Sequence, residues 1–559
     1  MPLPIPPREV LNWRLFYAVI CFGLMGAARG LDEGLIGTTV AQKSFMSEYG
    51  LVPSKKPTTA ELAMLANRKG NITAMVQIGS VGGALLAFIL CDKLGRLWAA
   101  RQLCCVWIIG TIVYITANGN YGQILAGRFV MGLGIGQTTV VAPAYLTEVA
   151  PRTIRGLCVC IFSGSVYLGI MLGYFANFGT SLHISNKNSL QWVEPTLMHI
   201  IFASIIFVMS FFALESPRWL CKVKRYDEAA AMMAKLRHLP EDHHYVRTEL
   251  IDIRDQLERE QEATMGSSFF GPLKELFLIG SNRYRIVLGL MCQLLGQWSG
   301  ANSMTIYAPQ FFQLLGTTGQ SESLFATAIF GVVKLVSALT CAFFLVDFIG
   351  RKRALSIGII IQFIAMLYIA IYLTSVPTIT AGKVQSGAAK HAATGAIAMI
   401  YFSGVGWALG WNSIQYLIGA EIFPLRVRAL GTSIIMCFHF INQYGNSKAV
   451  PLMLLTQSPG LKPQGTFWFF AAVTLLGLVY VWFFVPETAG KSLEAMDEMF
   501  GLPWHVIGRK GAKLTEGMGA LSEMVGHVDN EKLAQLEAEH AEHYEHAPQA
   551  RAELATERA

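Results

Sequence analysis

The chain has 559 residues, of which 53% are hydrophobic and only 14% are charged, and its formal net charge is +7. A water-soluble protein of this length needs more charge to cover its surface, so the composition excludes an ordinary soluble enzyme or binding protein. The positive charge gives no reason to expect a nucleic-acid partner, because basic loops beside membrane helices account for it.

Apolar stretches long enough to cross a bilayer as helices recur along the chain. We expect twelve spans, at 15–37, 71–91, 101–117, 123–146, 157–178, 197–214, 284–313, 323–346, 353–374, 392–418, 430–455 and 466–486. Lipid offers the backbone no hydrogen-bond partners, so such segments form helices. The expected fold class is therefore an all-α membrane protein with twelve transmembrane helices in two pseudo-symmetric six-helix halves.

A polar stretch separates the first six spans from the last six. We expect a cytoplasmic N-terminus (1–14), an N-terminal six-helix half (15–214), a cytoplasmic central loop with short helices (215–283), a C-terminal six-helix half (284–486) and a cytoplasmic C-terminal tail (487–559). Lys and Arg gather in alternate loops, although the loop at 38–70 also carries several. This bias predicts a multi-pass protein with both termini in the cytoplasm.

The sequence shows no chemistry typical of an enzyme. It has no Walker-type Gly-Lys-Ser/Thr loop, no nucleophile motif and no zinc-binding HExxH, and its ten cysteines form no CxxC pair. His540, His543 and His546 in the tail either form a metal site or, as we favour, lie on a solvated helix or a disordered segment. We expect no enzymatic activity, no cofactor and no metal.

Two patterns of charged residues occur once in each half, where an apolar run ends. Their ionic positions are Asp92, Arg96, Glu148 and Arg155 in the first half and Asp347, Arg351, Glu421 and Arg428 in the second. The charges either fix the topology, which explains the basic residues but not the repeated Glu, or form an inner gate at the cytoplasmic face. Exposed ion pairs are worth only about 0–1 kcal/mol each, so a network of them is easily made and broken. We favour the gate.

Further motifs make the chain resemble the sugar porter branch of the major facilitator superfamily across most of 10–500. In chain order they are Asp92-Lys-Leu-Gly-Arg96, Gly127-Arg128-Phe129, Pro143-x-Tyr145-x-x-Glu148, Glu215-Ser-Pro-Arg218, Gln297-Trp-Ser-Gly-Ala-Asn302, Asp347-Phe-Ile-Gly-Arg351 and Pro486-Glu-Thr-Ala-Gly-Lys491. The stretches at 7–14 and 36–39 resemble the fungal quinate permease subgroup. The resemblance implies a plasma-membrane transporter of this fold, with a ligand site at mid-membrane between two halves that open alternately to each side.

The resemblance also implies a route for proton coupling. Asp32 lies in the first span at the position of the family's Gly-Tyr-Asp motif, and in proton-coupled members this Asp pairs with the residue matched by Arg128. A carboxylate inside the membrane is costly when it is charged and unpaired, so gain of a proton can bias the conformational equilibrium. Glu33 adds a second acid. Alternatively, Arg29, one helical turn earlier, neutralises Asp32 locally. We expect coupling through Asp32, Arg128 and Glu33.

The substrate residues implied by the family are those at which this chain partly departs from the family pattern. They are Ser163, Gln297, Asn302, Trp411, Tyr416 and His439, with Gly296 in place of a second span-seven Gln. The retained amides suit sugar hydroxyls, because each amide both donates and accepts hydrogen bonds. A histidine can donate to a carboxylate or carry positive charge opposite it, unless His439 is only a packed core residue.

Together these features predict proton-coupled uptake of a monosaccharide-like polyhydroxylated compound, with quinate or a sugar acid such as galacturonate favoured. One alternative is a neutral hexose or pentose transporter or facilitator. Another is a nutrient-sensing receptor on the same fold. The partners we expect are the substrate, protons and the lipid bilayer; we expect no nucleic acid and a monomeric chain.

Overall fold

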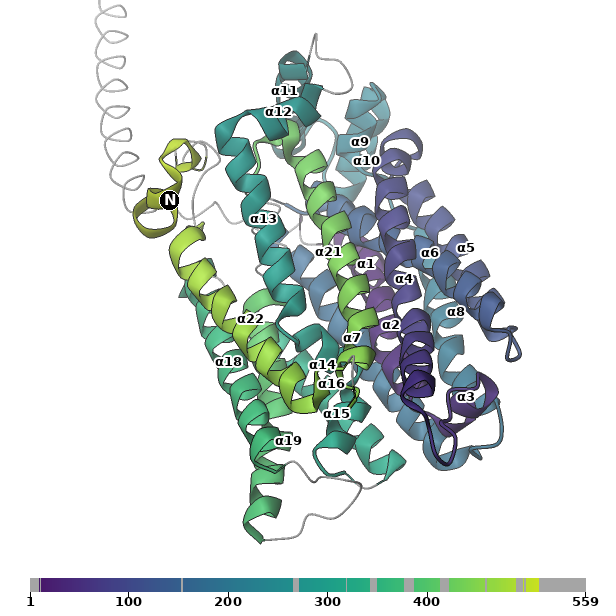
Figure 1. Ribbon diagram of the computed structural model, residues 1–559. Helices are drawn as coiled ribbons and strands as arrows, with labels where there is room; N and C mark the ends of the chain where they lie inside the picture. The colour runs from purple at the N-terminus through teal and green to yellow at the C-terminus, as the bar shows by residue number, and fades with distance from the viewer. Residues whose placement is uncertain are drawn as a thin grey trace, which may run out of the picture.

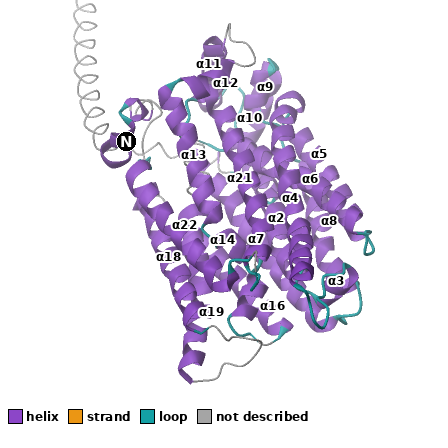
Figure 2. Ribbon diagram, viewed as in Figure 1, coloured by secondary structure: helices purple, strands orange, loops and turns teal. Residues whose placement is uncertain are grey.

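The computed structural model describes residues 10, 12–151, 154–264, 271–317, 319–341, 349–376, 387–412, 422–457, 460–488, 496 and 499–511. These residues form helices joined by short loops, and no strand occurs among them (Figure 2). The long helices run roughly alongside one another as one bundle (Figure 1). The expected all-α class is confirmed.

The first half contains six helical passes, the first of which is interrupted at Leu24. They are α1 (Trp13–Gly23) with α2 (Met25–Thr39), α4 (Thr59–Leu94), α5 (Arg96–Ile115), α6 (Tyr121–Val149), α7 (Arg155–His183) and α8 (Leu190–Ser210). Polar side chains cap the N-termini of several of these helices. Asn12 accepts hydrogen bonds from two backbone N–H groups at the start of α1, and Asn120 does the same for α6.

The second half repeats this arrangement with a first pass in three pieces. Its helices are α13 (Gly280–Trp298), α14 (Ala301–Ile306), α15 (Ala308–Leu314), α16 (Gln320–Thr340), α18 (Arg351–Ser375), α19 (Gly387–Trp407) continuing into η3 (Ala408–Asn412), α21 (Leu425–Met453) and α22 (Lys462–Phe484). The stretch at 284–313, expected as one span, breaks at Gly300, whose φ of +90° no regular helix has. The break turns the side chains of α14 toward the first half.

Ten helical segments among the described residues are long and apolar enough to cross a membrane. The other two expected passes are α13 and α21, which run along the bundle with the rest (Figure 1). Both carry arginines at their starts and amide or imidazole side chains further along, for example Gln293 and Gln297 on α13 and His439 and Gln443 on α21. Their polarity identifies them as helices that line an interior site rather than lipid.

Glycines let the helices that carry the site approach closely. A Cβ on Gly30 of α2 would lie 1.8 Å from the carbonyl oxygen of Val166 on α7, and one on Gly136 of α6 would lie 2.3 Å from that of Ser80 on α4. Small residues at such crossings are typical of membrane helix packing. They hold α2, α4, α6 and α7 in fixed register.

The two halves meet along several helix pairs. Three of these pairs are α4 with α21, α7 with α16, and α2 with α14. The contact between α7 and α14 includes a hydrogen bond of 2.5 Å from the Tyr174 hydroxyl to the carbonyl oxygen of Thr305. Side chains of α2, α14, α16 and α21 therefore lie at the interface between the halves.

Short helices cover the two ends of the bundle. At one end lie α9 (Pro217–Lys222), α10 (Tyr226–Arg237), α11 (His244–Thr264) and α12 (Gly271–Leu278), and at the other lies α3 (Lys43–Glu48) (Figure 1). Trp219, Met233 and Val246 form a separate small apolar core among α9, α10 and α11. Arg237 ties α10 to the bundle by donating to the carbonyl oxygen of Val149 at the end of α6. The last described helices are α24 (Trp504–Val506) and η4 (Ile507–Gly511).

Candidate functional site

A fully buried ion pair joins α2 to α6. Arg128 Nη1 lies 3.2 Å from Asp32 Oδ1, and the two side chains are only 1% and 3% exposed. Arg128 also donates to the carbonyl oxygens of Ile72, at 2.5 Å, and Thr73, at 3.3 Å, both on α4. Among the described residues this is the only ion pair of Asp32. The alternative in which Arg29 neutralises Asp32 is therefore not the arrangement found.

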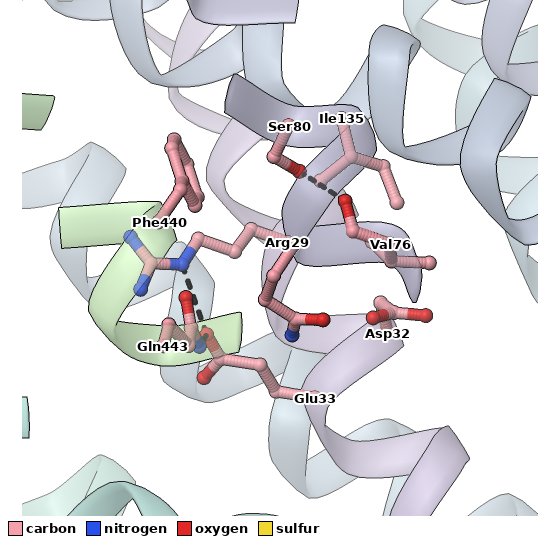
Figure 3. A pocket seen from close by; sticks show the side chains of 9 residues that line it. Arg29, Asp32, Glu33, Val76, Ser80, Ile135, Phe440 and Gln443 are labelled. Atoms are coloured by element: carbon pink, nitrogen blue, oxygen red, sulfur yellow. Dashed lines mark hydrogen bonds and ion pairs between the residues drawn. The ribbon is translucent and has the colours of Figure 1, made fainter. Parts of the chain in front are cut away.

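Arg29 instead forms an ion pair with Glu33 one turn later on α2. Arg29 Nε lies 2.9 Å from Glu33 Oε1, which also accepts a 2.9 Å hydrogen bond from Gln443 Nε2 on α21. Figure 3 shows Arg29 and Gln443 converging on Glu33, with the Phe440 ring beside the guanidinium, at 5.6 Å. Glu33 thus bridges the two halves.

His439 lies on the other side of Arg29. Its Nε2 is 2.8 Å from Arg29 Nη2, and its Nδ1 is 2.8 Å from Gln293 Oε1. A guanidinium only donates hydrogen bonds, so Nε2 accepts from Arg29. Nδ1 also lies 3.2 Å from Gln297 Nε2, and its shorter contact with Gln293 Oε1 fits a neutral ring whose Nδ1–H donates to Gln293. We expected His439 itself to donate to a ligand carboxylate or to carry the charge; in this arrangement the positive charge lies on Arg29.

These residues border a small pocket at the interface of the halves. Its lining comes from α2, α4, α6 and α21, and consists of Arg29, Asp32, Glu33, Val76, Gln77, Ser80, Ile135, Phe440 and Gln443. Both ion pairs of α2 therefore contribute a carboxylate to the same pocket (Figure 3). The pocket therefore presents two carboxylates and one guanidinium to a ligand.

Several buried polar atoms next to this region have no hydrogen-bond partner within the described part of the chain. They are Gln293 Nε2, Gln297 Oε1 and Asn302 Nδ2; Trp411 Nε1 on η3 also has no partner, but the Trp411 ring lies beside Gly477 on α22. Buried polar groups are normally satisfied, so unused donors and acceptors are typical of a place where a polar ligand or water binds. Asn302 Oδ1 is already engaged, because it accepts a 3.3 Å hydrogen bond from Gln443 Nε2.

The other two expected substrate residues are less informative. Ser163 lies on α7, half-buried, and makes no hydrogen bond with any described residue. Tyr416 falls outside the described residues. Arg29, Gln293 and Gln443 were not among the expected substrate residues, although the spacing of Gln443, one turn after His439, places both on one face of α21.

The charged residues expected to form a gate pair within the first half. Arg96 forms a bidentate ion pair with Glu148, at 2.7 and 2.9 Å, and a longer ion pair with Asp92, at 3.8 Å. Asp92 also pairs with Lys222 on α9 at 2.9 Å. These contacts join α4, α5 and α6 of the first half to α9 of the central stretch at 215–283. The side chain of Arg155 is outside the described part of the structure.

Glu215, which was not among the expected gate residues, is hydrogen-bonded to the same cluster. Its carboxylate accepts hydrogen bonds from the backbone N–H groups of Arg96, Leu97 and Ser216, at 2.9–3.1 Å, and so caps the start of α5. Burial raises the pKa of Glu215, although these three hydrogen bonds act in the opposite direction. Gly95, with φ +88°, makes room for the carboxylate: a Cβ there would lie 2.7 Å from Glu215 Oε2.

The second half repeats this cap. Glu487 accepts from the N–H groups of Arg351, at 2.9 Å, and Lys352, at 3.1 Å, and a Cβ on Gly350 would lie 2.7 Å from its Oε2. Arg428 donates to the carbonyl oxygen of Phe423 at 3.0 and 3.1 Å. Asp347 and Glu421 lie outside the described residues. No described contact of the repeated charges joins the two six-helix halves, and a latch between halves stays a prediction.

The sequence is similar to those of known membrane transporters. Residues 18–500 match the family described as "Sugar (and other) transporter". A quinate permease of Neurospora africana is 31% identical over 502 residues, covering 89% of this chain and 90% of the relative. A probable quinate permease of Aspergillus clavatus is 30% identical over 519 residues, covering 91% and 92%.

Solved structures share the fold. The proton:xylose symporter XylE bound to 6-bromo-6-deoxy-D-glucose superposes with a TM-score of 0.70 at 22% identity, over 87% of this chain and 99% of XylE. A partially occluded inward-open structure of XylE from E. coli gives 0.69 at 20% identity, over 86% and 100%. The chain therefore belongs to the sugar transporter family, the sugar porters of the major facilitator superfamily, and is a membrane transporter rather than an enzyme.

Proposed function

We propose that the chain is a proton-coupled plasma-membrane importer of a carboxylated polyhydroxylated compound, such as quinate or a sugar acid. The observation that carries the proposal is the presence of two ion pairs side by side on α2, Asp32 with Arg128 and Glu33 with Arg29. The first pair lies within one half, and the second is hydrogen-bonded to the other half through Gln443. In this proposal the proton binds to Asp32 of the first pair, and the substrate anion changes the electrostatic surroundings of the second pair.

Proton coupling would act through the first pair. A proton taken up by Asp32 cancels its charge and leaves Arg128 with the carbonyl oxygens of Ile72 and Thr73 as acceptors. Removing one charge from a buried pair changes its free energy by about 3–5 kcal/mol. A change of that size is enough to shift the populations of two conformations of the transporter, provided that they hold the pair differently.

The choice of substrate is supported by the polar groups at the interface. Gln297 and Asn302 each have a buried polar atom without a hydrogen-bond partner among the described residues, which suits a hydroxyl-rich ligand, and we add Trp411, which has such an atom on η3. Arg29 adds a cation that is held by Glu33 and His439. The names of the relatives, which are quinate permeases, agree with a ligand that carries both hydroxyls and a carboxylate.

The inner gate and the orientation complete the proposal. We place α9–α12 in the cytoplasm, where the basic loops fall, and assign the Arg96–Glu148 cluster and its counterpart around Arg351 to that face. In this proposal each cluster stiffens its own half, and contacts between the halves form and break as the transporter alternates.

The test is uptake by the full chain in a yeast strain that lacks its own sugar transporters. We expect labelled quinate or galacturonate to accumulate faster at external pH 5 than at pH 7, and a protonophore to abolish accumulation. Entry of glucose or xylose that depends on neither pH nor protonophore would instead identify a neutral-sugar facilitator. Surface expression without uptake of any of the four compounds would favour a receptor.

A further inference from the structure

Lys334 is a buried cation that the proposed mechanism does not use. It lies on α16 and is only 1% exposed. Its Nζ donates to the hydroxyl of Thr305 on α14, and the rings of Phe330 and Tyr167 lie 5.3 and 5.5 Å away. Lys334 forms no ion pair with any described residue. A lysine in the middle of a membrane helix is rare and is functional by default.

The position of Lys334 connects it to the site. Thr305 lies one turn after Asn302 on α14, and Asn302 is joined through Gln443 to Glu33. Tyr167 comes from α7, so Lys334 lies between a helix of the first half and two helices of the second. Alternating access must open this interface.

The charges at the interface do not balance. Arg128 is paired with Asp32, Arg29 is paired with Glu33, and His439 is neutral in its hydrogen-bond arrangement. Lys334 has no ion-pair partner among the described residues: the carboxylate that acts on it electrostatically is Glu33, which is already paired with Arg29, so two cations share one carboxylate. An uncompensated charge in a low-dielectric interior is costly, and an anionic ligand would remove that cost.

We propose that Lys334 binds the carboxylate of the transported substrate, while the amides of α13 and α14 bind its hydroxyls. The inference rests on the proposed function, because it takes the substrate to be a carboxylated polyol. It assigns the preference for an acid over a neutral analogue to Lys334 rather than to His439. Without substrate the lysine destabilises the protein, and the bound carboxylate stabilises it.

The experiment compares binding of quinate with binding of methyl quinate, its neutral ester, to the purified full chain in nanodiscs. We expect the wild type to prefer quinate, and Lys334→Met to weaken quinate binding about tenfold or more while changing methyl quinate binding less than about threefold. Lys334→Arg keeps the charge and should keep the preference. Arg285→Gln, which removes a buried cation at the start of α13, should keep it too.

A second measurement separates binding from folding. Because Lys334→Met removes an unpaired buried charge, the ligand-free variant should unfold at a higher temperature than the wild type and should no longer be stabilised by quinate. Equal loss of both ligands, or a preference that survives in Lys334→Met, would overturn the role of Lys334 alone. A wild type that binds glucose or xylose but none of quinate, galacturonate and gluconate would overturn the proposed function and this inference together.

Discussion

The Asp32–Arg128 pair allows a quantitative prediction, because both side chains are almost completely buried. Asp32→Asn leaves the guanidinium without its carboxylate, a change that typically costs about 3–5 kcal/mol. Arg128 keeps its hydrogen bonds to the carbonyl oxygens of Ile72 and Thr73. We therefore expect the unfolding free energy to fall by about 3 kcal/mol, the lower end of that range. Asp32→Asn combined with Arg128→Gln removes both charges and should lose much less than the sum of the two single variants.

The assay is reversible unfolding of the purified protein in mixed micelles, followed by tryptophan fluorescence, as a double-mutant cycle. We expect a coupling free energy of about 2–3 kcal/mol between the two positions. Glu228→Gln is the matched control: its pair with Arg225 is half-exposed, and such pairs contribute about 0–1 kcal/mol. Additive losses at Asp32 and Arg128, or a loss no larger than that of Glu228→Gln, would refute the idea that this pair holds substantial free energy.

Three further predictions follow from other contacts. Gly95→Ala should lower thermal stability markedly, because the new Cβ meets Glu215 Oε2 at 2.7 Å and φ is +88°; a melting temperature equal to that of the wild type would contradict the cap. Glu33→Gln should raise the affinity for quinate, measured by equilibrium binding, because it removes a negative charge that competes with the ligand carboxylate for the cations Lys334 and Arg29; an unchanged or lower affinity would exclude that competition. His439→Gln should reduce uptake of acids and of neutral sugars to a similar extent, because it removes the ring nitrogen that accepts from Arg29 but leaves Lys334 in place; a loss confined to acids would assign the preference to His439 instead of Lys334.

The helical architecture was predictable from the sequence because hydropathy along the chain carries most of its determinants. The twelve expected ranges each correspond to a helical pass, but hydropathy is a weak guide for α13 and α21. Their polar residues face the interior site, so composition understates their role as passes. Nor did hydropathy predict the break at Gly300, because the break depends on backbone conformation at a single residue.

The partners within the site were less predictable than its location. The contact of Arg29 with Glu33 follows from their spacing of four on one helix, whereas the contact with His439 joins residues 410 positions apart. Such a contact depends on how the two halves pack. Lys334 falls in the middle of the expected span 323–346, a position that could have singled it out from the sequence, but hydropathy gives no sign of its contact with Thr305.

The most direct test of the central claim is to record labelled quinate uptake and external pH in the same cell suspension. We predict external alkalinisation in proportion to quinate uptake in the wild type. In Asp32→Asn we predict that the pH signal and accumulation are lost, while exchange of labelled for unlabelled quinate continues. Accumulation of quinate by Asp32→Asn at the wild-type rate, or uptake by the wild type without any pH change, would contradict proton coupling through Asp32.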